Sequence, residues 1–141
     1  MRALLQVARG ASVAVDGAVV SSFEGEGIVA MVGVTHGDGT PEVETIARKI
    51  AELRILDGEA SVEERKAPVI VVSQFTLYAE TKKGRRPSWN GAAPGDVAEP
   101  LVAAVVESLR ARGLTVGTGI FGAHMEVSLV NDGPVTLLIE A

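Results

Sequence analysis

The chain has 141 residues, of which 47% are hydrophobic and 22% charged, and its formal net charge is −5. It contains no cysteine, which excludes disulfides, a cysteine nucleophile and thiolate metal ligands. The length predicts one domain, residues 1–141, with a core that needs no cross-link. No apolar stretch approaches the roughly 18–20 residues of a membrane span, so we expect a cytoplasmic protein without membrane contact. The acidic balance means that any nucleic acid must be bound by a local basic patch.

The first third of the chain alternates short β-branched runs with turn residues. Asp16-Gly17 stands between two apolar runs, and this pair is a strong hairpin signal. The pattern predicts antiparallel strands at residues 3–8, 12–15, 18–23 and 28–34.

Two segments have the apolar spacing of amphipathic helices. The first begins near Thr40, a capping residue, with Pro41 at the favourable first position. The second begins near Asp96, and Glu99 follows at the spacing of a capping box. Their predicted buried stripes are Val43, Ile46, Ala47, Ile50 and Leu53 in the first helix, and Leu101, Val102, Val105, Val106 and Leu109 in the second.

The remaining apolar runs predict strands. Residues 67–75 are apolar on both faces, as expected of a central strand covered on both sides. Three more runs, at 114–119, 125–131 and 135–140, close the chain. The sequence therefore predicts an α/β fold: a single compact domain with mainly antiparallel or mixed sheet layers and two amphipathic helices.

Residues typical of catalysis are few. The two histidines, His36 and His124, are far apart in sequence and no HExxH or GxSxG motif occurs, so we expect no metal and no cofactor. Residues 117–122 fit GxGxxG, but a strand-like run follows them where a dinucleotide site requires a helix.

Three local features remain. The polar stretch 73–76 ends a buried strand, where open α/β sheets place ligands, although an ordinary strand end would look the same. The basic run 82–86 lies between Tyr78 and Trp89 and could hold phosphates and stack bases, or could be a solvated loop. Residues 131–134, Asn-Asp-Gly-Pro, separate two apolar runs as a plain turn would, but a Gly-Pro bond can also be cis.

Taken together and in order, six segments resemble the D-aminoacyl-tRNA deacylase family of the D-tyrosyl-tRNA deacylase type. They are MRALLQ with ASV, GVTHGD, VVSQFTL, GRRPSW, GIFGAHMEVSLV and NDGPVT, and they span nearly the whole chain. SQFTL and NDGPVT are the two signature motifs of that family. The resemblance implies a homodimeric hydrolase, without cofactor, that cleaves the ester joining a D-amino acid to tRNA. Glycine mischarged on tRNA-Ala is a further substrate that the resemblance implies.

The resemblance also implies roles for individual residues. The active site would lie at the dimer interface, where the Gly-cisPro pair of one subunit enters the pocket of the other and rejects L-amino acids. The family uses the ribose hydroxyl of the substrate with water, so Thr76 is interpreted as pocket wall rather than nucleophile, because no neighbouring residue could deprotonate it. The implied residues are Ser73, Gln74, Phe75 and Thr76 for the catalytic pocket, Gly133 and Pro134 for chiral selection, Phe121 for the terminal adenine, and Lys82, Lys83, Arg85 and Arg86 for tRNA.

The chain departs from the family pattern in two places. Val7 follows Gln6 where the family usually has arginine, so bracing of the Gly-Pro segment either passes to Arg9 or differs. Residues 57–67 lack the Met-Asn-Leu type stretch that is common in relatives. Two other hypotheses stay open: an esterase that uses Ser73 or Thr76 covalently, and a noncatalytic module that binds the tRNA acceptor end.

Overall fold

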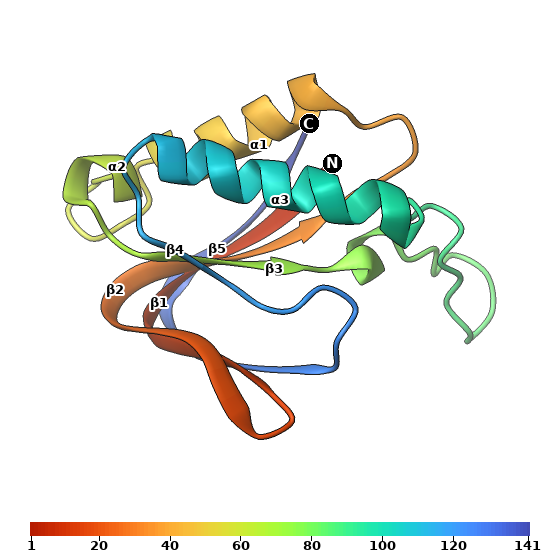
Figure 1. The fold of residues 1–141 in the computed structure, drawn as a ribbon, viewed down its shortest axis with the longest axis horizontal. Coiled ribbons are helices and arrows are strands. Elements are labelled where there is room, and N and C mark those ends of the chain that lie inside the picture. Colours follow the sequence, from red (N-terminus) through yellow and green to blue (C-terminus); the bar gives the residue numbers. More distant parts are fainter.

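A mixed five-stranded sheet with the order β4-β3-β2-β1-β5 organises the computed structural model, which describes residues 1–141 (Figure 1). Strand β1 is antiparallel to both β2 and β5, whereas β3 is parallel to β2 and to β4. The sheet therefore combines an antiparallel and a parallel half. The strands are β1 Arg2–Val15, β2 Ala18–Gly33, β3 Val69–Ser73, β4 Val116–Thr118 and β5 Met125–Glu140.

Helices cover one face of the sheet. Helix α1 (Thr40–Glu52) and helix α3 (Gly95–Ala111) pack against each other across this face (Figure 1). Both predicted stripes are confirmed except for Leu53 and Leu101, which are only half-buried. The larger core cluster fills the layer between helices and sheet, and a smaller one lies around Val13, Val29 and Ile70. None of the helices combines the length and apolar character that crossing a bilayer would need.

The prediction of separate short strands is wrong at three places, since residues 18–23 and 28–33 form one strand, β2. Residues 3–8 and 12–15 belong to one strand, β1, because a bulge at Gly10, with φ of +82°, lets the strand bend without ending. Residues 125–131 and 135–140 likewise belong to β5, with the Asn-Asp-Gly-Pro segment inside it. The bulges could not be located from alternation alone, since the apolar pattern simply restarts after each.

The two predicted amphipathic helices are confirmed as α1 and α3, and the structure adds a third α-helix of one turn, α2 (Val62–Arg65), after α1. It is held by a capping box: Ser61 Oγ accepts from the N–H of Glu64 at 3.1 Å, and Glu64 Oε2 accepts from the N–H of Ser61 at 2.9 Å. The latter bond is the main reason that the pKa of Glu64 lies below its usual value. The Ser-Val-Glu-Glu string carries this signal, but a helix of one turn has no apolar stripe to reveal it.

The predicted caps of the two longer helices are wrong as well. Gly39 is the N-cap of α1, and Glu42 Oε2 accepts from its N–H at 2.8 Å, so Thr40 is already helical. Helix α3 begins at Gly95 after Pro94, without a side-chain cap. Asp96 therefore lies in the first turn, where its charge favours the positive end of the helix dipole.

Arg2, near the beginning of β1, ties together segments that are distant in sequence. Its Nη1 donates to the carbonyl of Leu77 at 2.9 Å, its Nε lies 2.6 Å from Glu140 Oε1, and its guanidinium stacks 4.6 Å from the centre of the Tyr78 ring. Burial of the phenol, reinforced by the negative charge of Asp38, raises the pKa of Tyr78 to about 12, and Arg2 acts in the opposite direction.

We predict that Tyr78 ionises near pH 12 in the folded protein and near pH 10 in the unfolded chain. Because the native state holds the phenolic proton more tightly, the resulting stabilisation is complete below pH 10 and is lost as the pH rises through about 12. The chain has a single tyrosine, so phenolate absorbance measures this group alone. Titration in urea is the control, and a folded-state midpoint at the unfolded value would contradict the burial.

Candidate active site at the end of strand β3

The polar stretch after β3 is held in a fixed position. The N–H of Gln74 donates to the carbonyl of Val32 at 2.7 Å, which extends the β2–β3 pairing by one bond beyond Ser73. The chain then turns into a 3-10 helix, η1 (Phe75–Tyr78). A Cβ at Gly33 would lie 2.8 Å from the carbonyl oxygen of Gln74, so only glycine allows β2 and this stretch to come so close.

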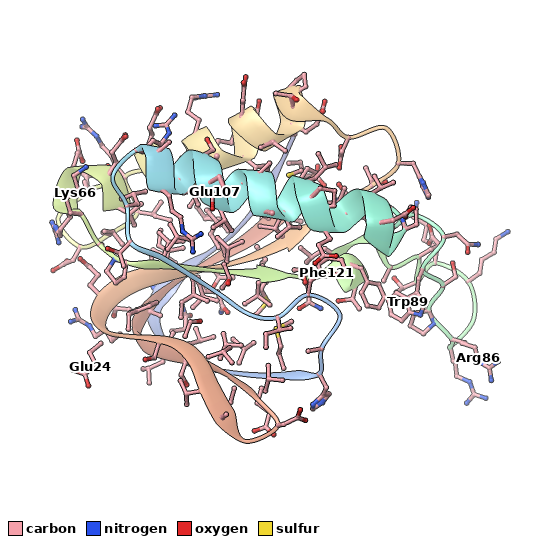
Figure 2. All side chains as sticks on the ribbon, in the orientation of Figure 1. Glu24, Lys66, Arg86, Trp89, Glu107 and Phe121 are labelled. Atoms are coloured by element: carbon pink, nitrogen blue, oxygen red, sulfur yellow. The ribbon has the colours of Figure 1, made fainter.

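A cavity of about 310 Å³ opens at this strand end. Its polar groups come from Ser73 and Gln74, and its wall is otherwise largely apolar, from β2, α3 and the loop segments around Trp89 and Phe121. Figure 2 shows Trp89 and Phe121 near the end of α3 at which the helix begins. The apolar lining residues are Val32, Val34, Phe75, Trp89, Ala92, Ala93, Ala98, Val102 and Phe121.

Three aromatic rings border the cavity. Phe75 and Trp89 pack edge to face with ring centres 5.5 Å apart and planes at 79°, and their exposed fractions are 55% and 44%. Phe121 is half-buried beside Gly95, where a Cβ would lie 3.5 Å from its ring. Exposed rings around an apolar hollow can stack on a planar base.

Thr76, unlike Ser73 and Gln74, does not line the cavity. Its Oγ1 accepts a hydrogen bond from Gln74 Nε2, and it lines neither this cavity nor a second one of about 250 Å³ beside His124. His36 bonds the carbonyl oxygen of Asn90 at 2.9 Å. Neither histidine contacts the Thr76 hydroxyl, so the chain places no base where it could activate this hydroxyl.

The basic run belongs to a loop that leaves the body of the molecule. Glu80 and Ser88 exchange two backbone hydrogen bonds at its base, of 2.9 and 3.1 Å, and Thr35 Oγ1 donates to the carbonyl of Gly91 at 2.6 Å. Figure 2 shows Arg86 at the outer end of this loop, directed away from the sheet. The side chains of Lys82, Lys83, Arg85 and Arg86 are exposed, and none forms an ion pair within the chain.

Gly133 and Pro134 lie elsewhere. The peptide bond between them is cis, and both residues line a groove of about 630 Å³ opposite residues 54–59. This groove shares no lining residue with the strand-end cavity. One chain thus brings together Ser73, Gln74, Phe75 and Phe121, but not the Gly-Pro pair.

Val7 makes no polar side-chain contact with the Gly-Pro segment, but Arg9 does. Its Nε lies 3.2 Å from Asp132 Oδ2, next to Gly133. The arginine two places later therefore supplies an ion pair to this segment. The structure contains no group of three or more His, Asp or Glu side chains that could hold a metal ion.

Sequence reasoning missed most of the cavity wall. Val32 and Val34 come from the end of β2 and the residues just after it, and Ala98 and Val102 from α3, where they read only as core residues. Their shared position results from the parallel pairing of β3 with β2, which no local pattern records. Trp89 flanks the basic run in sequence, and its contact with Phe75 joins that loop to the cavity.

Comparisons with known proteins identify relatives that match this chain along its whole length. A family model described as D-Tyr-tRNA(Tyr) deacylase matches residues 4–140. Proteins named D-aminoacyl-tRNA deacylase from Beutenbergia cavernae and Kineococcus radiotolerans are 62% and 59% identical over 141 residues, covering 100% of each chain.

Two solved structures are similar along the whole chain. A c-Myc DNA unwinding element binding protein has a TM-score of 0.91 at 36% identity, covering 100% of this chain and 99% of its own. A probable eukaryotic D-amino acid tRNA deacylase has a TM-score of 0.83 at 17% identity, covering 99% and 98%. The second likeness is one of fold.

Proposed function

The chain belongs to the D-Tyr-tRNA(Tyr) deacylase family, and we propose that it hydrolyses the ester bond of D-aminoacyl-tRNA. The products are the free D-amino acid and tRNA. The observation that carries this proposal is the cavity at the end of β3, where two polar residues face an aromatic, apolar hollow beside an unpaired basic loop. The substrate carries three matching groups: the ester carbonyl would lie at the polar residues, the terminal adenine at the aromatic rings, and the phosphates at the basic loop.

The chemistry requires little from the side chains. Water attacks the ester carbonyl, the bond between carbonyl carbon and ribose oxygen breaks, and that oxygen leaves with a proton. Backbone N–H groups beyond Gln74, whose own N–H is bonded to Val32, would stabilise the oxyanion, since preorganised donors act strongly where charge develops. The neighbouring ribose hydroxyl of the substrate would assist the water, which agrees with a Thr76 hydroxyl that is bonded to Gln74 and has no base beside it.

Chiral selection would come from Gly133 and Pro134. An L side chain would collide with a fixed backbone segment placed against the α-carbon, whereas a D side chain turns away and glycine has none to collide. Such rejection by a clash requires a rigid segment more than an attractive one. Glycine mischarged on tRNA-Ala would therefore be hydrolysed as well.

A homodimer would bring the two halves of the site together. Within one chain the Gly-Pro groove and the strand-end cavity share no residue, so the segment would act on the cavity of a second copy. Strand β5 is one of the two edge strands of the sheet, and it exposes Val130 at 65% and Leu138 at 54%. A long edge strand with exposed apolar side chains is a surface that proteins normally cover.

The test is deacylation of D-Tyr-tRNA, L-Tyr-tRNA and Gly-tRNA by the wild-type protein. We expect release of D-tyrosine and glycine and little release of L-tyrosine. Protection of the D-ester would instead indicate a noncatalytic module that binds the acceptor end. Hydrolysis of both enantiomers would indicate a general esterase.

Thr76→Ala separates the two chemical routes. We expect this variant to keep hydrolysis within about tenfold of wild type, since it loses one side-chain hydrogen bond of modest value. Ser73→Ala in the same assay tests the other hydroxyl. Complete loss of activity in either folded variant, with a burst of acyl-enzyme in the wild type, would favour covalent catalysis.

The basic loop is predicted to bind phosphates. The double variants Lys82→Ala/Lys83→Ala and Arg85→Ala/Arg86→Ala should each weaken tRNA binding. Each should also reduce the slope of log K against log salt by about one unit for every phosphate that the variant no longer neutralises. Arg48→Ala/Arg110→Ala removes two surface cations from α1 and α3 and is the matched control. If the salt dependence of binding in the two loop variants equals that of the control variant, the loop does not bind phosphates and is only solvated.

Sedimentation equilibrium should give a dimer, and Val130→Glu/Leu138→Glu should dissociate it. Both side chains are exposed in the single chain, so the charges should leave the monomer folded, as its circular dichroism would verify. We expect the dissociated variant to lose selective deacylation. A fully active monomer would refute the shared site.

A further inference from the structure

The Gly133-Pro134 segment leaves the sheet as a loop from the middle of β5. Gln6 pairs with Thr136 and Ala8 pairs with Asn131, so the single residue Val7 on β1 faces the four residues 132–135 on β5. Three residues are therefore extruded, as in an enlarged bulge. The ladder resumes on both sides of them.

This extrusion removes a hydrogen-bond partner from β1. In a regular ladder the carbonyl of Val7 would accept from a backbone N–H of β5. Here Asn131 Nδ2 donates to that carbonyl at 2.8 Å and also to the carbonyl of Val135 at 3.1 Å. One amide side chain thus replaces the missing ladder bond and joins the two legs of the loop.

The tip of the loop is not held by packing. A Cβ added at Gly133 would meet no atom within 4 Å, and Pro134 is exposed. At the base, Thr136 Oγ1 also donates to Asn131 Oδ1 at 3.5 Å, and Arg9 forms an ion pair with Asp132 at 3.2 Å, in which the two side chains are 59% and 33% exposed. Exposed pairs of this kind contribute little by themselves. Within one chain, the hydrogen bonds of Asn131 are therefore the principal restraint on the loop.

We propose that Asn131 is a positioning residue that sets the enantiomer selectivity of the protein by bracing the Gly133-Pro134 loop at its base, with the Arg9–Asp132 ion pair as an auxiliary restraint. The inference rests on the proposed function, in which this loop excludes L-amino acids. Asn131 does not touch the substrate in this account. It acts by keeping the loop in one place.

The test compares Asn131→Ala and Asn131→Asp with wild type. The aspartate keeps the shape of the side chain but has no N–H to donate, so both variants lose the brace. We expect the ratio of kcat/KM for D-Tyr-tRNA over L-Tyr-tRNA to fall by about tenfold or more, as loss of a restraint worth one or two hydrogen bonds implies. Ser128→Ala, a polar change within the regular part of β5, should leave the ratio unchanged.

Backbone rigidity gives a second readout that is independent of activity. The ¹⁵N order parameter of Gly133 should be near 0.85 in the wild type and below about 0.6 in Asn131→Ala, with little change elsewhere in β5. Arg9→Ala should have a smaller effect, and Arg9→Asp/Asp132→Arg should restore the wild-type value.

The outcomes distinguish this inference from the proposed function. A wild type that does not hydrolyse D-Tyr-tRNA refutes the function, and the order parameters then decide on the brace alone. A selective wild type whose Asn131 variants keep the D over L ratio, with or without a more mobile loop, refutes Asn131 as a determinant of selectivity. An unchanged Gly133 order parameter in Asn131→Ala refutes the brace.

Discussion

The parallel pairing of β3 with β2 is the constraint on which the site depends. It buries Val69 to Val72 on both faces and brings the polar end of the strand out beside α3. The last bond of this pairing, from Gln74 to Val32, requires a glycine at position 33. The side chains of Val69 to Val72 are buried on both faces of the sheet. A slip of the pairing by one residue would turn each of them to the opposite face and would displace the stretch 73–76.

The strand-end cavity and the Gly133-Pro134 loop differ in how they are held. The inner wall of the strand-end cavity is formed by residues packed into the core, namely Val32, Val34, Ala93, Ala98 and Val102. The Gly-Pro loop is far more open to solvent and depends on a few polar contacts at its base. The position of the cavity wall is fixed by side-chain packing, whereas the position of the Gly133-Pro134 loop is fixed by hydrogen bonds and an ion pair. A dimer would combine a pocket and a loop that the single chain keeps apart.

Local sequence patterns correctly predicted the elements whose formation depends mainly on neighbouring residues. The stripe from Val43 to Ile50 predicted α1, and the doubly apolar run before Ser73 predicted a central strand. Prediction failed where a distant partner decides: Gly10 marks a bulge only because β2 lies opposite, and Asn131 reads as a turn residue until its bond to Val7 is known. Helix α2 was missed because one turn leaves no periodicity. The family resemblance supplied residue roles that periodicity could not.

The pairing of β1 with β5 also has a consequence for the order of assembly. Arg2 contacts Glu140, 138 positions away in sequence, so this half of the sheet has very high contact order and is expected to form slowly. During synthesis, β1 and β2 can fold as a hairpin while the outer side of β1 remains an open edge. The elements of the strand-end cavity all precede β5 in the chain. The residues that line the pocket therefore all leave the ribosome before the Gly133-Pro134 segment does.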